Sequence, residues 1–441
     1  MPLESGAPRE ILNDVTAADW APDGKQMAVV RYQPGKQTLE YPIGKTLHET
    51  QGWIGNPRFS PDGKRIAFID HTARNDDGGA VAVVDLAGNK KDLTEAWSSI
   101  RGMAWNPTRD EIWFTASALG ASRGLYAVNL SGKSLPVAAV PGTMTLFDVA
   151  KDGRALVAEA NERVEMAARS KDWTGERSLS WLDWTLLADL SADGKTVLFT
   201  EGGEGGGPDY ATYVRKIDGS PAVRLGEGQA FELSPDGRWC VVARSHNGGA
   251  LFLVPTGAGE LRQLTSGNLT VYGPTWLPGG IGVLYSGREN GHKARVYLKK
   301  LDGSAESALT PEGFTVARHG VSPDSGSFLA IRGAEKQLVL VPIKGGDGQA
   351  VPGVDANEIA IQWAPDGHSI YAYKYGTPTS PSRISEVDIK TGKRDLVKAW
   401  MPDDRAGYAG FDIGQITPDG KTIAYSYTRV LGDLYLVEAA R

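Results

Sequence analysis

The sequence predicts an all-β fold of the β-propeller class, because a strand–turn–strand unit recurs along the whole chain of 441 residues. The clearest copy of the turn is Ser234-Pro235-Asp236-Gly237, which has apolar residues on both sides. Proline presets φ, aspartate bonds its own backbone, and glycine accepts the positive φ that closes a hairpin. The turns lie about 44 residues apart on average, a period typical of propeller blades rather than of helical repeats. The ten proline-equivalent positions are Pro22, Pro61, Pro107, Lys151, Ala192, Pro235, Pro278, Pro323, Pro365 and Pro418.

A second hairpin follows the turn in several repeats, as at residues 125–130 with Ser131-Gly132, and at 213–217 with Asp218-Gly219. Two hairpins per repeat predict four strands per blade. The last repeat ends at residues 433–438, where a third strand is expected, and residues 8–15 resemble the fourth strand of other repeats. We therefore expect one ring of ten blades over residues 1–441, closed by the N-terminal strand. Because about four to eight blades are typical, two smaller propellers are the alternative.

Tryptophans recur at one place in the repeat, two residues before the turn proline or its equivalent. They are Trp20, Trp105, Trp276 and Trp363, with Phe59, Leu190 and Leu233 at the same place in other repeats. Equivalent aromatic residues in a repeat array are typical of packing between neighbouring units. We expect this set to form core contacts rather than to stack on a ligand.

The composition excludes several classes of protein. Lys and Arg number 47 against 53 acidic residues, a net charge of −6, so nucleic acid is not an expected partner. Cys240 is the single cysteine, so no disulfide framework exists. The N-terminus has no basic segment followed by an apolar core, and no window approaches 18 apolar residues. We expect no export signal and no membrane insertion by this chain.

No pattern for catalysis or for binding of a metal or cofactor stands out, so none of these is predicted. Gly120-Ala-Ser122-Arg-Gly124 matches Gly-x-Ser-x-Gly, but a strand is expected after it where a nucleophile elbow needs a helix. The six histidines are His48, His71, His246, His292, His319 and His368, and no two have short metal-ligand spacing. A propeller axis can nevertheless gather residues that are distant in sequence. The acidic loops at 74–79 and 401–405 lack the ligand spacing of a calcium site and are expected to be solvated turns.

The candidate ligand-binding residues lie mainly on insertions, which in repeat proteins gather on the working face. Trp181 and Trp184 flank Asp183, so two rings could stack on a sugar or peptide group while the acid orients it. The alternative, favoured by the abundance of aromatics in propeller cores, is that both rings fill the seam between blades 4 and 5. The full set is Trp181, Asp183, Trp184, Trp53, His48 and His319.

The turn sequence [Ser/Ala/Thr]-Pro-Asp-Gly-[Lys/Arg] followed by an apolar strand resembles the TolB-type propeller repeat. Residues 41–50, 179–184, 218–228, and 417–427 with 434–438 together resemble the C-terminal propeller region of bacterial eukaryotic-type serine/threonine kinases, and this similarity spans nearly the whole chain. The resemblance implies a sensor domain outside the membrane and a kinase domain as a partner. The chain itself has no glycine-rich loop with Val-Ala-x-Lys, no His-Arg-Asp and no Asp-Phe-Gly, so kinase activity is not implied.

The function expected from these observations is non-catalytic binding of a small ligand, glycan or peptide at the axial mouth of the propeller, as in a sensor module. Two alternatives stay open because propellers host many functions. One is an axial-channel lyase or hydrolase that acts on a polysaccharide, which requires at least three polar side chains converging on one axial point. The other is a TolB-like scaffold that binds an extended peptide.

Overall fold

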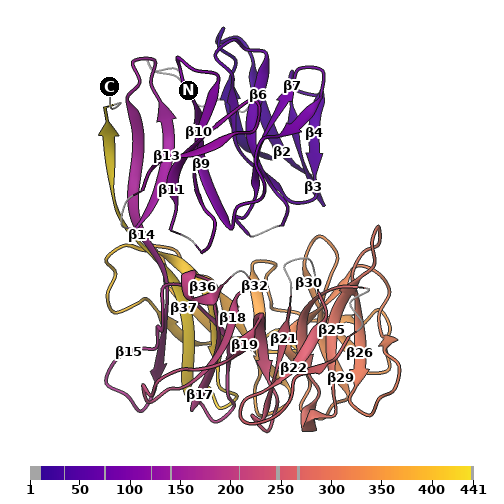
Figure 1. Ribbon diagram of the computed structural model, residues 1–441. Coiled ribbons are helices and arrows are strands. Elements are labelled where there is room, and N and C mark those ends of the chain that lie inside the picture. Colours follow the sequence, from indigo (N-terminus) through magenta and orange to yellow (C-terminus); the bar gives the residue numbers. More distant parts are fainter. Residues whose placement is uncertain are drawn as a thin grey trace. The chain divides into compact units, whose positions relative to one another are not determined.

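The computed structural model describes residues 11–33, 35–73, 76–120, 122–139, 142–207, 209–244, 249–265 and 269–438. These residues form strands joined by turns, with two short 3-10 segments, η1 (Glu204–Gly206) and η2 (Pro278–Gly280) (Figure 1). The chain divides into two compact units: unit 1 is 1–161 with 432–441, and unit 2 is 162–431. The all-β propeller prediction is confirmed, but the single ring is not, because the repeats are shared between two units as in the alternative.

Unit 1 contains three four-stranded antiparallel sheets, each formed by consecutive strands. Their strands are β1 (Val15–Trp20), β2 (Met27–Gln33), β3 (Lys36–Glu40) and β4 (Thr46–Thr50); β5 (Trp53–Phe59), β6 (Arg65–His71), β7 (Ala80–Asp85) and β8 (Lys90–Asp92); and β9 (Ser99–Trp105), β10 (Glu111–Ser117), β11 (Gly124–Asn129) and β12 (Ser134–Ala138). The first strands of these sheets pack in succession, and β13 (Thr143–Val149) packs against β9.

Unit 2 contains five further sheets of the same kind. Their strands are β16 (Thr185–Leu190), β17 (Thr196–Glu201), β18 (Ala211–Lys216) and β19 (Val223–Glu227); β20 (Gln229–Leu233), β21 (Trp239–Ala243), β22 (Leu251–Pro255) and β23 (Arg262–Gln263); β24 (Thr270–Trp276), β25 (Gly282–Arg288), β26 (Arg295–Lys300) and β27 (Ser307–Ala308); β28 (Phe314–Val321), β29 (Ser327–Arg332), β30 (Gln337–Pro342) and β31 (Gln349–Ala350); and β32 (Glu358–Trp363), β33 (Ser369–Lys374), β34 (Ser382–Asp388) and β35 (Arg394–Trp400). The first strands again pack in succession, and β36 (Tyr408–Ile416) packs against both β32 and β16, so the inner strands of unit 2 form a closed ring.

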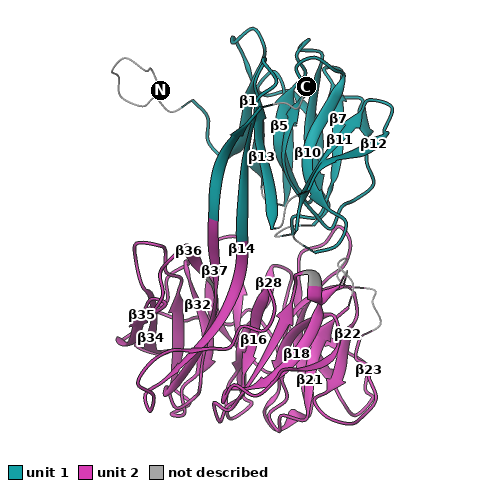
Figure 2. Cartoon of the chain, turned by 60° about the vertical axis from the view of Figure 1, so that its left-hand side comes forward, with its two compact units in different colours: residues 1–161, 432–441 teal, residues 162–431 magenta. Residues whose placement is uncertain are grey.

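The remaining sheet is built from two distant repeats, and its long strands β14 (Ala155–Ser170) and β37 (Thr422–Val437) pass from one unit into the other (Figure 2). The strand order is β13-β14-β37-β36, and β15 (Arg177–Ser178) also pairs with β14. In unit 1 the first half of β14 pairs with β13, and in unit 2 the first half of β37 pairs with β36. The two repeats therefore share one sheet, to which the last repeat contributes a hairpin and the earlier one a hairpin with the short strand β15.

The expected closure by an N-terminal strand is wrong over the described residues. Residues 11–14 belong to no strand, β1 begins at Val15 and pairs with β2, and β37 has β36 and β14 as neighbours. Residues 8–10 of the expected strand lie outside the described residues. The physical reason is that β14 runs on for 16 residues and occupies the edge of β37 that the last repeat leaves unpaired.

The turns form as the sequence predicts, and all ten proline-equivalent positions fall between the first two strands of a repeat. In the Ser234 copy, the Gly237 amide donates to the Ser234 carbonyl at 2.7 Å, and Gly237 has φ of 68°. The Asp236 carboxylate accepts from the Ser234 hydroxyl at 2.5 Å and from the Arg238 amide at 3.0 Å. The aspartate thus holds the turn on both sides, which explains its recurrence.

The recurring tryptophans lie between neighbouring sheets at three of their four positions, where they are at most 7% exposed. Each of the three indole N–H groups donates to the carbonyl that lies three residues before the turn in the preceding repeat. The pairs are Trp105 with Arg58, Trp276 with Glu232 and Trp363 with Gly320, at 3.0, 3.3 and 2.9 Å. Trp20 departs from the expectation and is 57% exposed.

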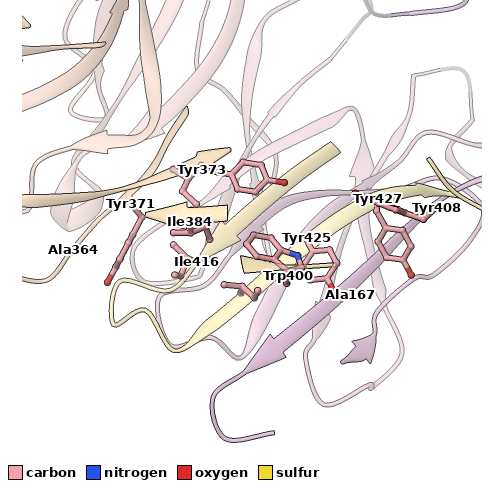
Figure 3. Packing of buried hydrophobic residues seen from close by; sticks show 12 residues of the cluster. Ala167, Ala364, Tyr371, Tyr373, Ile384, Trp400, Tyr408, Ile416, Tyr425 and Tyr427 are labelled. Carbon is pink, nitrogen blue, oxygen red and sulfur yellow. The ribbon is translucent and has the colours of Figure 1, made fainter. Parts of the chain in front are cut away.

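Aromatic side chains form the core between the last sheets of unit 2, as Figure 3 shows. The rings of Trp400 and Tyr425 lie 5.5 Å apart. Beside this core, Arg169 of β14 donates to the Tyr425 hydroxyl at 3.3 Å and pairs with Asp403 at 2.6 Å. Side chains of β14 and β37 therefore join within unit 2 through apolar packing and through bonded charges.

No helix among the described residues has the length and apolar character needed to cross a membrane.

Candidate functional site

The residue three positions before the turn proline or its equivalent lies on the first strand of its sheet, and in six repeats it directly follows a β-bulge. The register shifts between Leu187 and Asp189 on β16, and between Ala230 and Glu232 on β20. A bulge re-aims the next side chain. In unit 2 these two neighbouring strands present acidic side chains, Asp189 and Glu232, which are 2% and 4% exposed.

His319 of β28 lies between these two carboxylates. Its Nε2 is 2.9 Å from Asp189 Oδ1, and its Nδ1 is 3.2 Å from Glu232 Oε1. Because β28 neighbours β24 and β32 in the ring, a contact from β28 to β16 crosses the interior of the ring. The structure therefore places this cluster, which we call the axial cluster (Asp189, Glu232 and His319), inside the ring of unit 2.

The axial cluster holds His319 as an imidazolium, since carboxylate oxygens accept hydrogen bonds and both ring nitrogens face one. Burial opposes the charged ring, but the negative charges of Glu232 and Asp189 and their hydrogen bonds outweigh it and raise the pKa of His319 to about 10. A protonated ring has no lone pair with which to accept a proton, so His319 is not a general base at neutral pH.

Backbone amides hold the two carboxylates in place independently of His319. Asp189 accepts from the amides of Leu190 and Leu233, both at 2.7 Å, and Glu232 Oε1 accepts from the Trp276 amide at 3.3 Å. The acidic side of the cluster is therefore fixed by the main chains of β16, β20 and β24.

Three buried polar atoms at this level of the ring have no hydrogen-bond partner among the described residues: Glu232 Oε2, Thr275 Oγ1 and Gln415 Nε2. All three residues stand three positions before their turn, on β20, β24 and β36, and are at most 4% exposed. Buried polar atoms are nearly always bonded. A polar group bound in this ring would find one anionic acceptor, one hydroxyl and one amide donor.

The predicted ligand-binding residues are divided between the two units. His319 lies in the interior of unit 2, and Trp181, Asp183 and Trp184 form the loop that precedes β16. Trp53 and His48 belong to unit 1, where Trp53 stacks on His71 with ring centroids 3.5 Å apart, and His48 Nε2 lies 3.1 Å from Asp70 Oδ2. Their role in binding stays a prediction.

A buried carboxylate on β17 holds the loop with Trp181 and Trp184 through hydrogen bonds. Glu201 of β17 accepts from the Thr185 hydroxyl at 2.6 Å and from the amides of Leu182 and Trp184 at 3.2 and 3.4 Å. A Cβ at Gly203 would fall 2.3 Å from Asp183 Oδ1, so the glycine-rich segment packs directly on this loop. Trp181 remains 38% exposed, while Trp184 is half-buried.

We expect Glu201→Ala to loosen this loop, because it leaves two backbone amides and a hydroxyl without their acceptor. The loss in free energy of unfolding should be about 2 to 4 kcal/mol. Hydrogen-exchange mass spectrometry should show faster exchange at residues 181–185. Glu227→Ala, on the edge strand β19 of the same sheet, is the control and should leave that exchange unchanged. Equal acceleration by both variants would contradict the role of Glu201.

The pKa of His71 in unit 1 is lowered, whereas that of His319 is raised. Its Nδ1 donates to the Gly78 carbonyl at 3.1 Å, and burial lowers the pKa of His71 to about 4. A neutral imidazole with Nδ1 protonated results. The nearby charges of Asp77, Asp70 and Asp76 favour the protonated ring but do not overcome burial.

This burial predicts a loss of stability in acid. The unfolded chain binds a proton on His71 below pH 6.5, whereas the folded chain does so only near pH 4. Stability from His71 is therefore present above pH 6.5 and is lost as the pH falls from about 6.5 to about 4, by about 3 kcal/mol. Urea denaturation across this range should show the loss, and His71→Gln should flatten it; an unchanged slope in the variant would overturn the assignment.

The other candidates for chemistry give no reactive arrangement. Cys240 is fully buried, and burial raises the pKa of its thiol to about 12. Strand β11 begins at Gly124, so a strand follows the Gly-x-Ser-x-Gly stretch as expected. No group of three or more His, Cys, Asp and Glu side chains in the described part of the chain is arranged to hold a metal ion. His246 lies outside the described residues.

No family model matches the sequence. Over 159 residues the chain is 28% identical to the uncharacterized peptidase YuxL of Bacillus subtilis, which covers 35% of this chain and 23% of that protein. The chain thus matches about a quarter of the length of that curated relative.

Solved structures with a similar course of the chain include several propeller proteins. A putative TolB from Agrobacterium tumefaciens is 18% identical, covering 61% of this chain and 99% of that chain, with a TM-score of 0.42. The oligogalacturonate lyase of Vibrio parahaemolyticus is 15% identical, covering 58% and 76%, with a TM-score of 0.40. A puromycin-hydrolyzing peptidase of Mycobacterium tuberculosis is 14% identical, covering 80% and 54%, with a TM-score of 0.35. These likenesses carry no functional argument, and TolB-like β-propellers are among the structures to which this chain is similar.

Proposed function

We propose that this chain is a non-catalytic binding protein whose ligand engages the axial mouth of unit 2. The axial cluster is the observation that carries the proposal. The carboxylates of Asp189 and Glu232 are fixed by backbone amides, and Glu232 Oε2, Thr275 Oγ1 and Gln415 Nε2 have no partner among the described residues. Such preorganised polar groups bind and orient a ligand. His319 is protonated there, which favours binding over proton transfer.

Arrays of peptides and glycans probed with the full chain test this proposal. We expect a retained ligand class whose binding falls at least tenfold in Glu232→Gln, since that change removes the negative charge that faces the ring interior. The matched control is Glu227→Gln, at the edge of the same unit, which should bind as the wild type does. Incubation of the retained ligand with the protein should return it intact by mass spectrometry. A cleaved ligand, or binding that is indifferent to Glu232→Gln, would overturn the proposal.

A second candidate is an axial enzyme, a peptidase or a polysaccharide lyase. The similarity to a stretch of a peptidase favours this candidate. It requires at least three polar side chains converging on one axial point, and the axial cluster supplies Asp189, Glu232 and His319. It also requires one of them to be in a reactive protonation state, which the protonated ring of His319 does not favour. Incubation with peptides and with oligogalacturonate, followed by mass spectrometry, tests it: cleavage that Asp189→Asn abolishes would support an enzyme.

The biological setting that we propose is a sensor or interaction module outside the cytoplasm, acting with a kinase domain. The support is the resemblance of residues 41–50, 179–184 and 417–427 to kinase-associated propellers. The reading frame upstream of Met1 tests it, because a kinase domain and a membrane span there would place this module outside. A TolB-like peptide scaffold is the alternative setting, and it predicts that the arrays retain extended peptides rather than glycans.

A further inference from the structure

The strand that carries His319 contains an unusually large bulge. On β28, Val316 pairs with Ala330 and Val321 pairs with Phe328, so residues 317–320 lie opposite a single residue of β29. Extra residues on one strand bend out of the ladder. His319 itself has φ of 44°, a left-handed conformation that is uncommon for residues other than glycine.

This bulge carries two cationic side chains across the ring. The Arg318 guanidinium donates through Nη1 to the Ala188 carbonyl on β16, and His319 bonds Asp189 beside it. Both contacts reach a strand that is not a neighbour of β28. The bulge is therefore a crossing segment that brings positive charge to residues of other sheets. We call the receiving residues on β16 and β20, which include Asp189 and Glu232, the acidic wall.

The acidic wall would remain anionic without the crossing segment. Backbone amides from β16, β20 and β24 hold Asp189 and Glu232, as described above, and Glu232 Oε2 keeps one accepting oxygen that no described residue satisfies. An imidazolium has only two N–H groups, and both are used. His319 therefore has no N–H group left to donate to Glu232 Oε2.

We propose that the segment 317–320 is a tethered occupant of this wall, and that the ligand of the axial mouth carries a cationic group, the guanidinium or ammonium of a basic peptide, that replaces His319 between Asp189 and Glu232. This inference rests on the proposed binding function. A guanidinium presents five donors in a planar fork, enough to bond both carboxylates and the spare oxygen of Glu232. The His319 side chain is 14% exposed, against 2% for Asp189 and 5% for Glu232, so it is the most exposed member of the axial cluster. Its release also relieves the left-handed backbone.

The test is isothermal titration calorimetry of the full chain with N-acetyl-arginine methylamide. His319→Asn removes the tethered cation while asparagine tolerates the left-handed backbone. We expect this variant to bind the probe at least tenfold more tightly than the wild type. Adding Glu232→Gln should reverse the gain by at least tenfold. N-acetyl-citrulline methylamide, which has the same shape without the charge, should bind neither protein measurably.

His292→Asn is the matched control, because His292 pairs with Glu312 on an exposed turn of the same unit. It should bind the probe as the wild type does. Equal affinity of wild type and His319→Asn, or equal binding of the citrulline compound, would overturn the inference. Array binding of neutral glycans that depends on Glu232 would keep the proposed function and overturn only this inference.

A measurement on the wild type covers the case in which His319→Asn does not fold. In protein with 15N-labelled histidine, saturating probe should shift the His319 ring signals from an imidazolium that titrates near pH 10 to a ring that titrates near pH 6.5. Ring signals that keep titrating near pH 10 under saturating probe would overturn the replacement of His319.

Discussion

Replacing Asp189 by alanine is expected to lower the free energy of unfolding by about 3 to 5 kcal/mol. The change removes the acceptor of two amides, those of Leu190 and Leu233, and one of the two carboxylates that neutralise His319. Removing one partner of a buried ion pair costs more than the pair contributes, because the remaining charge stays out of water. Urea denaturation of the full chain, with hydrogen exchange at residues 185–190 and 229–233, measures this loss and locates it.

Gln362→Ala is the control for this prediction. Gln362 stands at the same place before its turn, on β32, but its side chain accepts from the amide of the next residue, Trp363, at 3.0 Å. Its loss should cost about 1 kcal/mol. Comparable losses in both variants would show that the bulged position itself, rather than the axial cluster, determines stability.

The stability of unit 2 is expected to fall as the pH rises from about 6.5 to about 10. The pKa of His319 is about 10 in the folded chain and 6.5 when unperturbed, so the folded state keeps a proton that the unfolded state releases. This contribution is fully present below pH 6.5 and is lost as the pH passes 10, by about 3 to 5 kcal/mol. Asp189 and Glu232 face the ring, and the Cys240 thiol near Asp189 titrates only at about 12.

Denaturation of wild type and His319→Asn at half-unit pH intervals measures this dependence. The wild type should lose stability steadily through the interval, while the variant should start lower and stay nearly flat. His368→Asn, on an exposed turn, should retain the slope of the wild type. A slope that persists in His319→Asn would assign the alkaline loss to another group.

Local chemistry made the turns and the strands that flank them predictable. Ser234, Asp236 and Gly237 each have one role in closing the turn, and those roles depend only on neighbouring residues. The packing of Trp105, Trp276 and Trp363 also follows from the repeat, because each indole N–H donates to the equivalent backbone carbonyl of the preceding repeat. Repeated local rules therefore specify the class of fold.

The division into two units could not be predicted from the repeat. The period shows that a β-hairpin segment recurs, but it does not show which strands pair at the edges of the sheets. Repeat 4 offered a signal: residues 155–170 run without the glycine turn that ends the second strand elsewhere, and form one strand. The polar residues 161–163 in the middle of this stretch interrupt its apolar pattern, so the sequence did not predict a single strand. Pairing between β14 and β37 joins residues more than 250 positions apart, and no local rule reports it.

The sequence predicted only one of the three residues of the axial cluster. His319 was a candidate, but its partners were not, because Asp189 and Glu232 are brought to it by ring closure. A signal existed in their position: both stand three residues before the turn, in successive repeats, where side chains follow a bulge. Asp19 and Asp148 occupy the same place in unit 1, where Asp19 accepts from the Phe59 amide at 2.8 Å.

The two long strands also set an order in which the chain can mature on the ribosome. Residues 432–437 belong to unit 1, yet they are translated after the whole of 162–431. Domains generally fold as units while synthesis proceeds. Unit 2 thus has its residues available first, and the first 161 residues, although made earliest, must wait in a partly exposed state for their final strand. Chaperone dependence during translation should accordingly concentrate on the earliest part of the chain.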